Sequence, residues 1–202
     1  IIDKIINASK IRSSDEVLEI GPGTGNLTKF IVSQKPKKIY VIEKDENLVS
    51  TLEKQYFNKI NIIKKDILKI PFNFYSGKKF LVLGNLPYNI STKILSNLCT
   101  NNELNVSRMI LMFQKEVAER ILADVNSRNY SRITILSKWK FDISRVTDVK
   151  PNSFFPRPKV HSTVLEFIPK RKIHEIKDPK NLEKITKVFF NQRRKMIKKP
   201  IK

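Results

Sequence analysis

The sequence has few of the residues from which disulfides and metal sites are built. Among 202 residues there are one cysteine, Cys99, and two histidines, His161 and His174. A single thiol excludes an intramolecular disulfide and a metal site made of several thiolates. The histidines are far apart and lack a supporting cluster of carboxylates or thiols, so we expect no metal. Cys99 lies in an apolar stretch with helical character, where a thiol more often packs in the core than acts as a nucleophile.

Long apolar runs and acidic residues are also scarce. No stretch approaches the ~18 apolar residues of a membrane-spanning helix, and no secretory or transit peptide is apparent. There are 40 lysines and arginines against 19 aspartates and glutamates, a net charge of +21. An AT-rich genome, which favours Lys, Ile and Asn, can account for part of this excess, but such a field attracts polyanions. We therefore expect a cytoplasmic protein whose partner is a nucleic acid, with an anionic membrane surface as the alternative.

Short apolar runs alternate with amphipathic stretches up to about residue 114, a pattern typical of an α/β domain with a mostly parallel sheet. The apolar runs predict strands over 17–20, 38–42, 60–64, 80–84 and 109–113. The amphipathic stretches predict helices over 26–33, over 46–56, from 91 onward and over 115–123.

The pattern changes beyond residue 123. A helix is predicted over 131–139, followed by strands over 143–149 and 162–168 that a proline-rich loop joins. Two strands joined in this way fit an antiparallel hairpin that closes a parallel sheet, so we expect a doubly wound α/β fold of about seven strands. A basic segment with a helix over 181–191 follows. We therefore place a boundary near residue 170, between a domain 1–170 and a partial helical C-terminal subdomain 171–202.

A glycine-rich loop follows the first predicted strand, in the segment Glu19-Ile20-Gly21-Pro22-Gly23-Thr24-Gly25. Glycines at alternate positions permit a tight turn with positive φ and a close approach of the backbone to a ligand. The helix behind them supplies free N–H groups. Glu43 ends the second strand, 22 residues after Gly21, where a carboxylate can accept hydrogen bonds from both ribose hydroxyls of a cofactor. A simple turn or a dinucleotide enzyme would show the same pair, so hydride transfer stays open at this point.

Asp66 follows the third predicted strand, in Lys65-Asp66-Ile67. The position lies at the carboxyl edge of the sheet, beside the same crevice. A carboxylate there can accept a proton from the adenine amino group of an adenosyl cofactor. The alternative is that Asp66 only caps the helix that follows.

The tetrapeptide Asn85-Leu86-Pro87-Tyr88 follows the fourth predicted strand. The lone pair of adenine N6 is delocalised into the ring, so methylation is helped by acceptors that favour a pyramidal nitrogen. The side-chain carbonyl of Asn85 and the backbone carbonyl of Leu86 fit this task, while Pro87 stiffens the turn. Tyr88 offers a face on which an extruded base can stack. The alternative is a proline turn with a core tyrosine.

The stretch Gly84-Asn85-Leu86-Pro87-Tyr88-Asn89-Ile90-Ser91-Thr92, together with 19–25, resembles the ribosomal RNA adenine dimethyltransferase family. Phe113-Gln114-Lys115-Glu116-Val117 and Ser153-Phe154-Phe155-Pro156-Arg157-Pro158-Lys159-Val160 are similar to later motifs of that family. The match runs in order over nearly the whole chain. It is nearer to the housekeeping small-subunit enzymes than to the erythromycin-resistance enzymes, which act on large-subunit RNA.

The resemblance implies a Rossmann-like class I methyltransferase that uses S-adenosylmethionine, releases S-adenosylhomocysteine and needs no metal. The residues implied to bind the cofactor are Glu19, Gly21, Gly23, Gly25, Glu43, Lys44, Asp66, Ile67 and Asn85. The implied catalytic residues are Asn85, Leu86, Pro87, Tyr88 and Phe154, with Phe155 as a near alternative for the second stacking aromatic. The implied reaction places two methyls on each of two adjacent adenosines near the 3′ end of small-subunit rRNA, in the immature small ribosomal subunit.

The basic cluster Arg193-Arg194-Lys195 is predicted to contact rRNA phosphates, with a solvated helix face as the alternative. The family also carries a Gln-Asn-Phe-Leu segment, ahead of the point where this sequence starts, that helps to close the cofactor pocket. We expect a monomer. Three rival functions remain: a large-subunit drug-resistance methylase, a non-catalytic RNA-binding or assembly factor, and, least supported, a dinucleotide-dependent oxidoreductase.

Overall fold

A seven-stranded sheet runs through the centre of the computed structural model, which describes residues 1–154 and 157–191. Five neighbouring strands are parallel, in the order β3 (Asn61–Lys64), β2 (Lys38–Glu43), β1 (Glu16–Ile20), β4 (Lys79–Asn85) and β5 (Asn105–Gln114). Two antiparallel strands complete the sheet, β7 (Ser162–Pro169) beside β5 and then β6 (Phe141–Val149) at the edge. The predicted fold class is confirmed.

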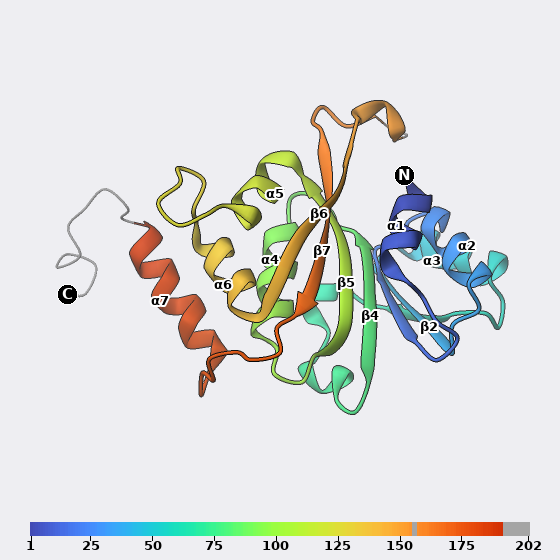
Figure 1. The fold of residues 1–202 in the computed structure, drawn as a ribbon. Helices are drawn as coiled ribbons and strands as arrows, with labels where there is room; N and C mark the ends of the chain where they lie inside the picture. Colours follow the sequence, from blue (N-terminus) through green and yellow to red (C-terminus); the bar gives the residue numbers. More distant parts are fainter. Residues whose placement is uncertain (155–156, 192–202) are drawn as a thin grey trace.

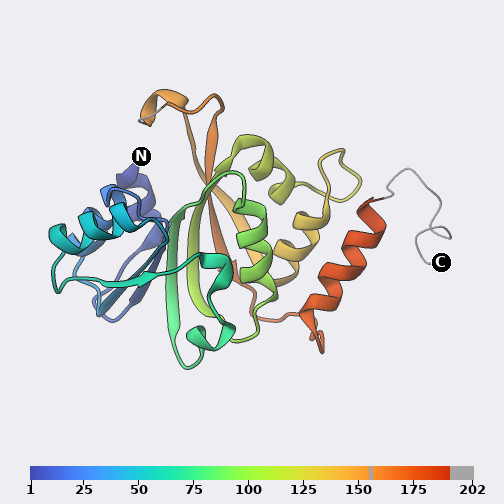
Figure 2. The ribbon, with the colours of Figure 1, turned by 180° about the vertical axis from the view of Figure 1, so that it is seen from behind.

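Helices cover both faces of this sheet, as Figures 1 and 2 show from opposite sides. One layer contains α1 (Ile2–Ser9), α2 (Asn26–Ser33) and α3 (Glu46–Gln55). The other contains α4 (Ser91–Thr100), α5 (Lys115–Leu122), α6 (Arg132–Lys140) and α7 (Pro179–Asn191). Short 3-10 turns lie at η1 (Ile67–Lys69), η2 (Phe72–Tyr75) and η3 (Pro151–Ser153).

Burial on both faces explains why the central strands are apolar at consecutive positions rather than alternating ones. Along β4, the four residues from Phe80 to Leu83 are at most 2% exposed. Phe80 and Val82 pack toward α4, whereas Leu81 and Leu83 pack toward α1 and α2. Each face of the strand therefore serves a separate hydrophobic cluster.

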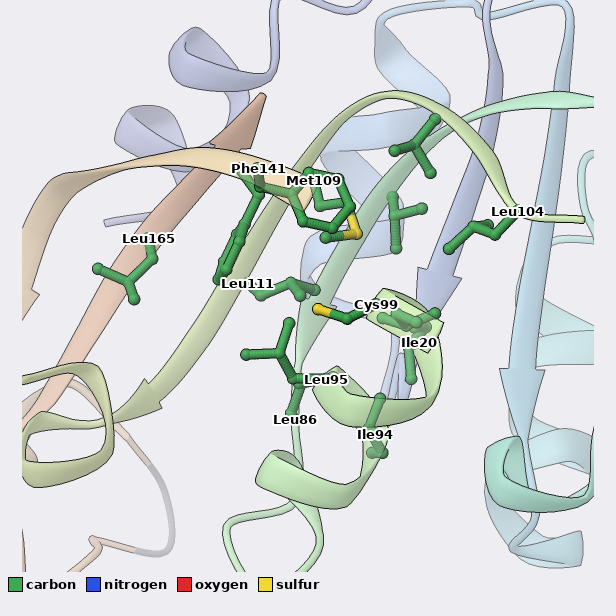
Figure 3. Packing of buried hydrophobic residues seen from close by; sticks show 14 of the residues in the cluster. Ile20, Leu86, Ile94, Leu95, Cys99, Leu104, Met109, Leu111, Phe141 and Leu165 are labelled. Carbon is green, nitrogen blue, oxygen red and sulfur yellow. The ribbon is translucent and has the colours of Figure 1, made fainter. Parts of the chain in front are cut away.

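Cys99 lies within the cluster between the sheet and α4, near Leu95 and Leu111 in Figure 3. It is fully buried, and this burial raises the pKa of its thiol to about 12. The thiol therefore stays protonated at neutral pH, which agrees with the predicted packing role.

Two elements differ from the sequence-based expectations. The helix α1 was not predicted, although Ile2, Ile5 and Ile6 have the spacing of an apolar helical face. The strand β5 begins at Asn105 rather than at 109. Its early part is polar, but Arg108 there donates to the Ala8 carbonyl at 2.7 Å and pairs with Glu166 at 3.0 Å. These long-range partners make a polar segment part of the sheet.

The helix α7 is fixed to the layer of α4 and α6 by Glu183. Its Oε1 accepts a hydrogen bond from Ser96 at 2.9 Å and lies 3.3 Å from the guanidinium of Arg132. Leu182 packs against the same core cluster as α4. The division near residue 170 stays a prediction. None of the helices within 1–154 and 157–191 is long and apolar enough to cross a bilayer.

Candidate active site

The chain reverses its direction of winding between β1 and β4. It proceeds from β1 outward to β2 and β3, and then crosses back to β4 on the other side of β1. In an open α/β sheet, the crevice outside the carboxyl ends of the strands at such a reversal is where ligands bind. The glycine loop, Glu43, Asp66 and Asn85 all lie at or just beyond these strand ends.

The glycine loop has the backbone conformation that its sequence predicts. Gly21, Gly23 and Gly25 have φ angles of 67°, 58° and 82°. The loop is anchored at its start, where the Gly21 amide donates to the Ile42 carbonyl at 3.0 Å. A Cβ added at Gly23 would meet no atom within 4 Å, so open space lies in front of the loop.

Gly25 is required for a second reason, which the sequence did not reveal. A Cβ at this position would lie 2.8 Å from the ring of Tyr56, at the end of α3. The Tyr56 hydroxyl also donates to the Gly25 carbonyl at 2.9 Å. The ring thus supports the loop from behind and leaves no room for a side chain.

Glu19 supports the loop from the interior. Its side chain is 1% exposed, and Oε2 accepts a hydrogen bond from Thr28 of α2 at 2.7 Å. Burial raises the pKa of this carboxyl to about 7, partly offset by the Thr28 hydrogen bond. The hydrogen bond to Thr28 ties the end of β1 to α2 and so positions the loop between them. A contact of Glu19 with a cofactor stays a prediction.

Glu43 has one carboxylate oxygen held in place. Its Oε1 accepts from the backbone amides of Lys44 at 2.8 Å and Asp45 at 3.1 Å. No residue in the described ranges bonds to its Oε2. A carboxylate fixed in this way can accept hydrogen bonds from ribose hydroxyls without first losing side-chain freedom.

Asp66 caps the turn η1, since its Oδ1 accepts from the Leu68 amide at 2.9 Å. Asp66 is therefore a capping residue, as the alternative expected. It does not compete with a cofactor role, because the second oxygen has no partner within the part of the chain that the structure describes. Ile67 is half-buried beside it and packs against the core cluster.

The tetrapeptide begins directly beside the glycine loop. A Cβ at Gly21 would lie 3.6 Å from the Asn85 carbonyl oxygen. The Asn85 side chain is exposed and has no hydrogen-bond partner among residues 1–154 and 157–191. Leu86 turns the other way, and its side chain is 1% exposed in the core of Figure 3. A buried leucine therefore anchors the turn, while the neighbouring amide faces solvent.

Tyr88 is held by a residue that sequence reasoning missed. Its hydroxyl lies 2.6 Å from Oγ of Ser162, the fully buried first residue of β7. Ser162 pairs with Gln114 and Val149, the last residues of β5 and β6. Its only sequence signal is its place at the start of the predicted strand 162–168.

The segment between β6 and β7 projects beyond the end of the sheet, on the side of the N-terminus in Figure 1. It carries Phe154, whose half-buried ring packs against the cluster that contains Ile5 and Val149. The Lys115 amide donates to the His161 carbonyl at 2.9 Å, which holds the segment next to the end of β5. Phe155, Arg193, Arg194 and Lys195 lie outside the described residues. Within the described ranges, no group of three or more His, Cys, Asp and Glu side chains could hold a metal ion.

Comparisons with known proteins place this chain among relatives of one family. A family model described as ribosomal RNA adenine dimethylase matches residues 1–202. The chain is 52% identical to ribosomal RNA small subunit methyltransferase A of Pelagibacter ubique, over 99% of this chain and 77% of that protein. It is 39% identical to the protein of the same name from Malacoplasma penetrans, over 96% of this chain and 70% of that one.

Two solved structures have a similar fold. A dimethyladenosine transferase from Plasmodium falciparum has a TM-score of 0.79 and 34% identity, over 98% of this chain and 71% of that one. The 23S rRNA methyltransferase ErmE has a TM-score of 0.73 and 23% identity, over 95% of this chain and 76% of that one. At that lower identity, the second likeness shows the fold alone.

Proposed function

The chain belongs to the ribosomal RNA adenine dimethylase family, and from this membership we propose that it dimethylates N6 of two adjacent adenosines near the 3′ end of small-subunit rRNA. Family membership makes it a methyltransferase. Its 52% and 39% identical relatives carry the name small subunit methyltransferase, which supports the choice of subunit. The substrate in the cell is then the immature small ribosomal subunit.

S-adenosylmethionine supplies an electrophilic methyl group when it is bound. The glycine loop, with its positive φ angles and open space at Gly23, allows the backbone to approach the cofactor closely. The free oxygen of Glu43 would accept hydrogen bonds from the ribose hydroxyls, and the free oxygen of Asp66 would accept one from the adenine amino group. Lys44 and Ile67 border these two carboxylates along the chain.

Asn85 and the Leu86 carbonyl orient the target amine. The unmethylated amine would donate one N–H to each of them, which would favour a pyramidal nitrogen with an exposed lone pair. The methylated amine loses its proton readily, so no strong general base is needed. The observation that carries this proposal is the exposed, unbonded Asn85 side chain, whose own backbone carbonyl lies 3.6 Å from the Cβ position of Gly21.

Tyr88 and Phe154 clamp the extruded adenine between them, with Pro87 holding the turn. Tyr88 is supported in this role by its hydrogen bond to Ser162, and Phe154 by its place on the segment at the same edge of the sheet. Arg193, Arg194 and Lys195 contact rRNA phosphates, and the protein acts as a monomer.

Replacement of Asn85 by alanine tests the proposed chemistry. Asn85→Ala should abolish methyl incorporation into undermethylated small subunits, because one of the two acceptors for the amine is lost. Calorimetric binding of S-adenosylmethionine should weaken only modestly. Asn102→Ala, at an exposed position of the opposite sheet edge, is the matched control and should retain full activity. Full activity of Asn85→Ala would contradict the amine-orienting role.

The same assays separate the rival functions. Methyl incorporation into large but not small subunits would indicate a drug-resistance type of enzyme. A calorimetric titration with S-adenosylmethionine that releases no heat would favour a non-catalytic RNA-binding factor.

A further inference from the structure

The edge of the sheet opposite the active site carries a pocket lined by lysines. It lies between the segment that joins α2 to β2 and the turn that precedes β3, and its cavity volume is about 520 Å³. We call it the lysine pocket, after its four basic residues, Lys35, Lys37, Lys38 and Lys59.

The charge of this pocket is largely unneutralised. Lys37 is paired with Glu16 at 3.6 Å, an exposed contact of the kind that stabilises little. Lys35, Lys38 and Lys59 are exposed and form no ion pair with any residue in the described ranges. The described residues that line the pocket include no aspartate or glutamate. Such a surface attracts an anion, and most strongly a polyanion.

Hydrogen bonds hold the backbone segments that form the walls of the pocket. The Asn61 side chain donates to the Ile39 carbonyl at 3.1 Å, which ties β3 to β2 across the floor. The Lys59 amide donates to the Tyr56 carbonyl at 2.9 Å and closes the turn before β3. Lys35 on the facing wall has a left-handed backbone with φ of 51°, which closes the end of α2. The lysines are therefore presented from a preformed concavity.

An exposed aromatic residue lies in the same turn. Phe57 is 76% exposed, the largest exposed fraction among the exposed large hydrophobic side chains of the described residues. Phe57 lies two positions before Lys59 in the chain, and an exposed aromatic ring next to cations can stack on an unpaired base while the cations contact the backbone. Neither the Phe57 ring nor the unpaired lysine side chains contribute to the hydrophobic core.

We propose that the lysine pocket and Phe57 form a second RNA-binding surface, which contacts the phosphodiester backbone of an rRNA segment other than the one that enters the active site. The inference rests on the proposed function for the identity of the RNA. The two surfaces lie at opposite ends of β2, which has six residues, and are therefore roughly 20 Å apart. A single target nucleotide cannot contact both of them. On this proposal the pocket contacts RNA remote from the target adenosine, so a folded particle that presents two rRNA segments would bind more tightly than a short strand.

A triple substitution tests the surface. Lys35→Gln, Lys38→Gln and Lys59→Gln together should weaken binding to undermethylated small subunits by about tenfold or more and lower the slope of log affinity against log salt by roughly two to three. The KM for the particle should rise, whereas kcat should stay near that of the unsubstituted protein. The matched control replaces three other exposed lysines by glutamine: Lys172 and Lys177, in the segment before α7, and Lys184, within α7. It should change the salt slope much less.

The role of Phe57 is tested separately. Phe57→Ala should weaken particle binding. Phe57→Trp should bind the particle as the unsubstituted protein does, because phenylalanine and tryptophan both offer a stacking surface and alanine does not. Unchanged affinity and salt slope in the lysine variant would overturn the proposal. An equal loss of affinity in the control variant would also overturn it, because it would indicate a general effect of the protein's net positive charge. Binding of polyglutamate to the pocket that RNA cannot displace would indicate an acidic protein partner and would also overturn the proposal. Binding is measured independently of methyl transfer, so an inactive but particle-binding protein would refute the proposed function and leave this surface standing.

Discussion

The contact between Tyr88 and Ser162 should set how well the proposed base-stacking residue works. In Tyr88→Phe the ring is kept, but the fully buried Ser162 hydroxyl loses its 2.6 Å partner. An unsatisfied buried hydroxyl costs ~1–3 kcal/mol. In Ser162→Ala the half-buried Tyr88 hydroxyl can turn to water, so the cost should be nearer ~1 kcal/mol. The double variant leaves no orphaned group, and its loss should be smaller than the sum of the two.

The prediction is checked with a double-mutant cycle on two readouts. Urea unfolding should give a coupling free energy of about 1 kcal/mol or more between the two positions. Methyl transfer should slow by up to about tenfold in either single variant, since 1.4 kcal/mol of lost orientation corresponds to that factor. Tyr88→Ala should be far slower, because the stacking face itself is removed.

The control for this experiment is Tyr130→Phe. Tyr130 is half-buried and packs its ring near Phe190, but its hydroxyl makes no hydrogen bond with any described residue. It should behave like the unsubstituted protein in both assays. Strictly additive effects at Tyr88 and Ser162, or full activity in both single variants, would refute the view that Ser162 positions the ring.

Two further predictions concern the glycine loop and its support. Because burial raises the pKa of Glu19 from 4.5 to about 7, the folded state holds this proton more tightly than the unfolded state. The free energy of unfolding should therefore fall as pH rises from about 4.5 to about 7. In urea unfolding, Glu19→Gln should become more stable than the unsubstituted protein by up to roughly 3 kcal/mol between about pH 5 and pH 8. A stability difference that does not depend on pH would contradict the ionisation argument. Gly25→Ala should lose ~2 kcal/mol or more of stability, because its Cβ would lie 2.8 Å from Tyr56. At Gly23 a Cβ would meet no atom within 4 Å, so Gly23→Ala should cost only ~1 kcal/mol of stability. It should nevertheless weaken cofactor binding measured by calorimetry. Equal stability losses at the two glycines would show that the Tyr56 contact is unimportant.

The sequence alone predicted which residues lie at the carboxyl edge of the sheet, because the relevant signals are local. Glycines at alternate positions after a strand require positive φ angles, and the three loop glycines adopt them. Parallel strands bring their carboxyl ends to one edge, so Glu43, Asp66 and Asn85 were expected together before any pairing was known. The apolar runs located the strands within a few residues, because strands covered on both faces are apolar throughout.

Only the tertiary structure decided the features that depend on contacts between distant segments. The insertion of β7 between β5 and β6 places Ser162 against Tyr88, 74 positions away in the chain. The burial of Glu19 and the packing of Tyr56 on Gly25 likewise join residues of different elements. The lysine pocket forms because the starts of β2 and β3 are neighbours. Periodicity describes which side of its own element a residue occupies, whereas these contacts are set by which elements pair and pack.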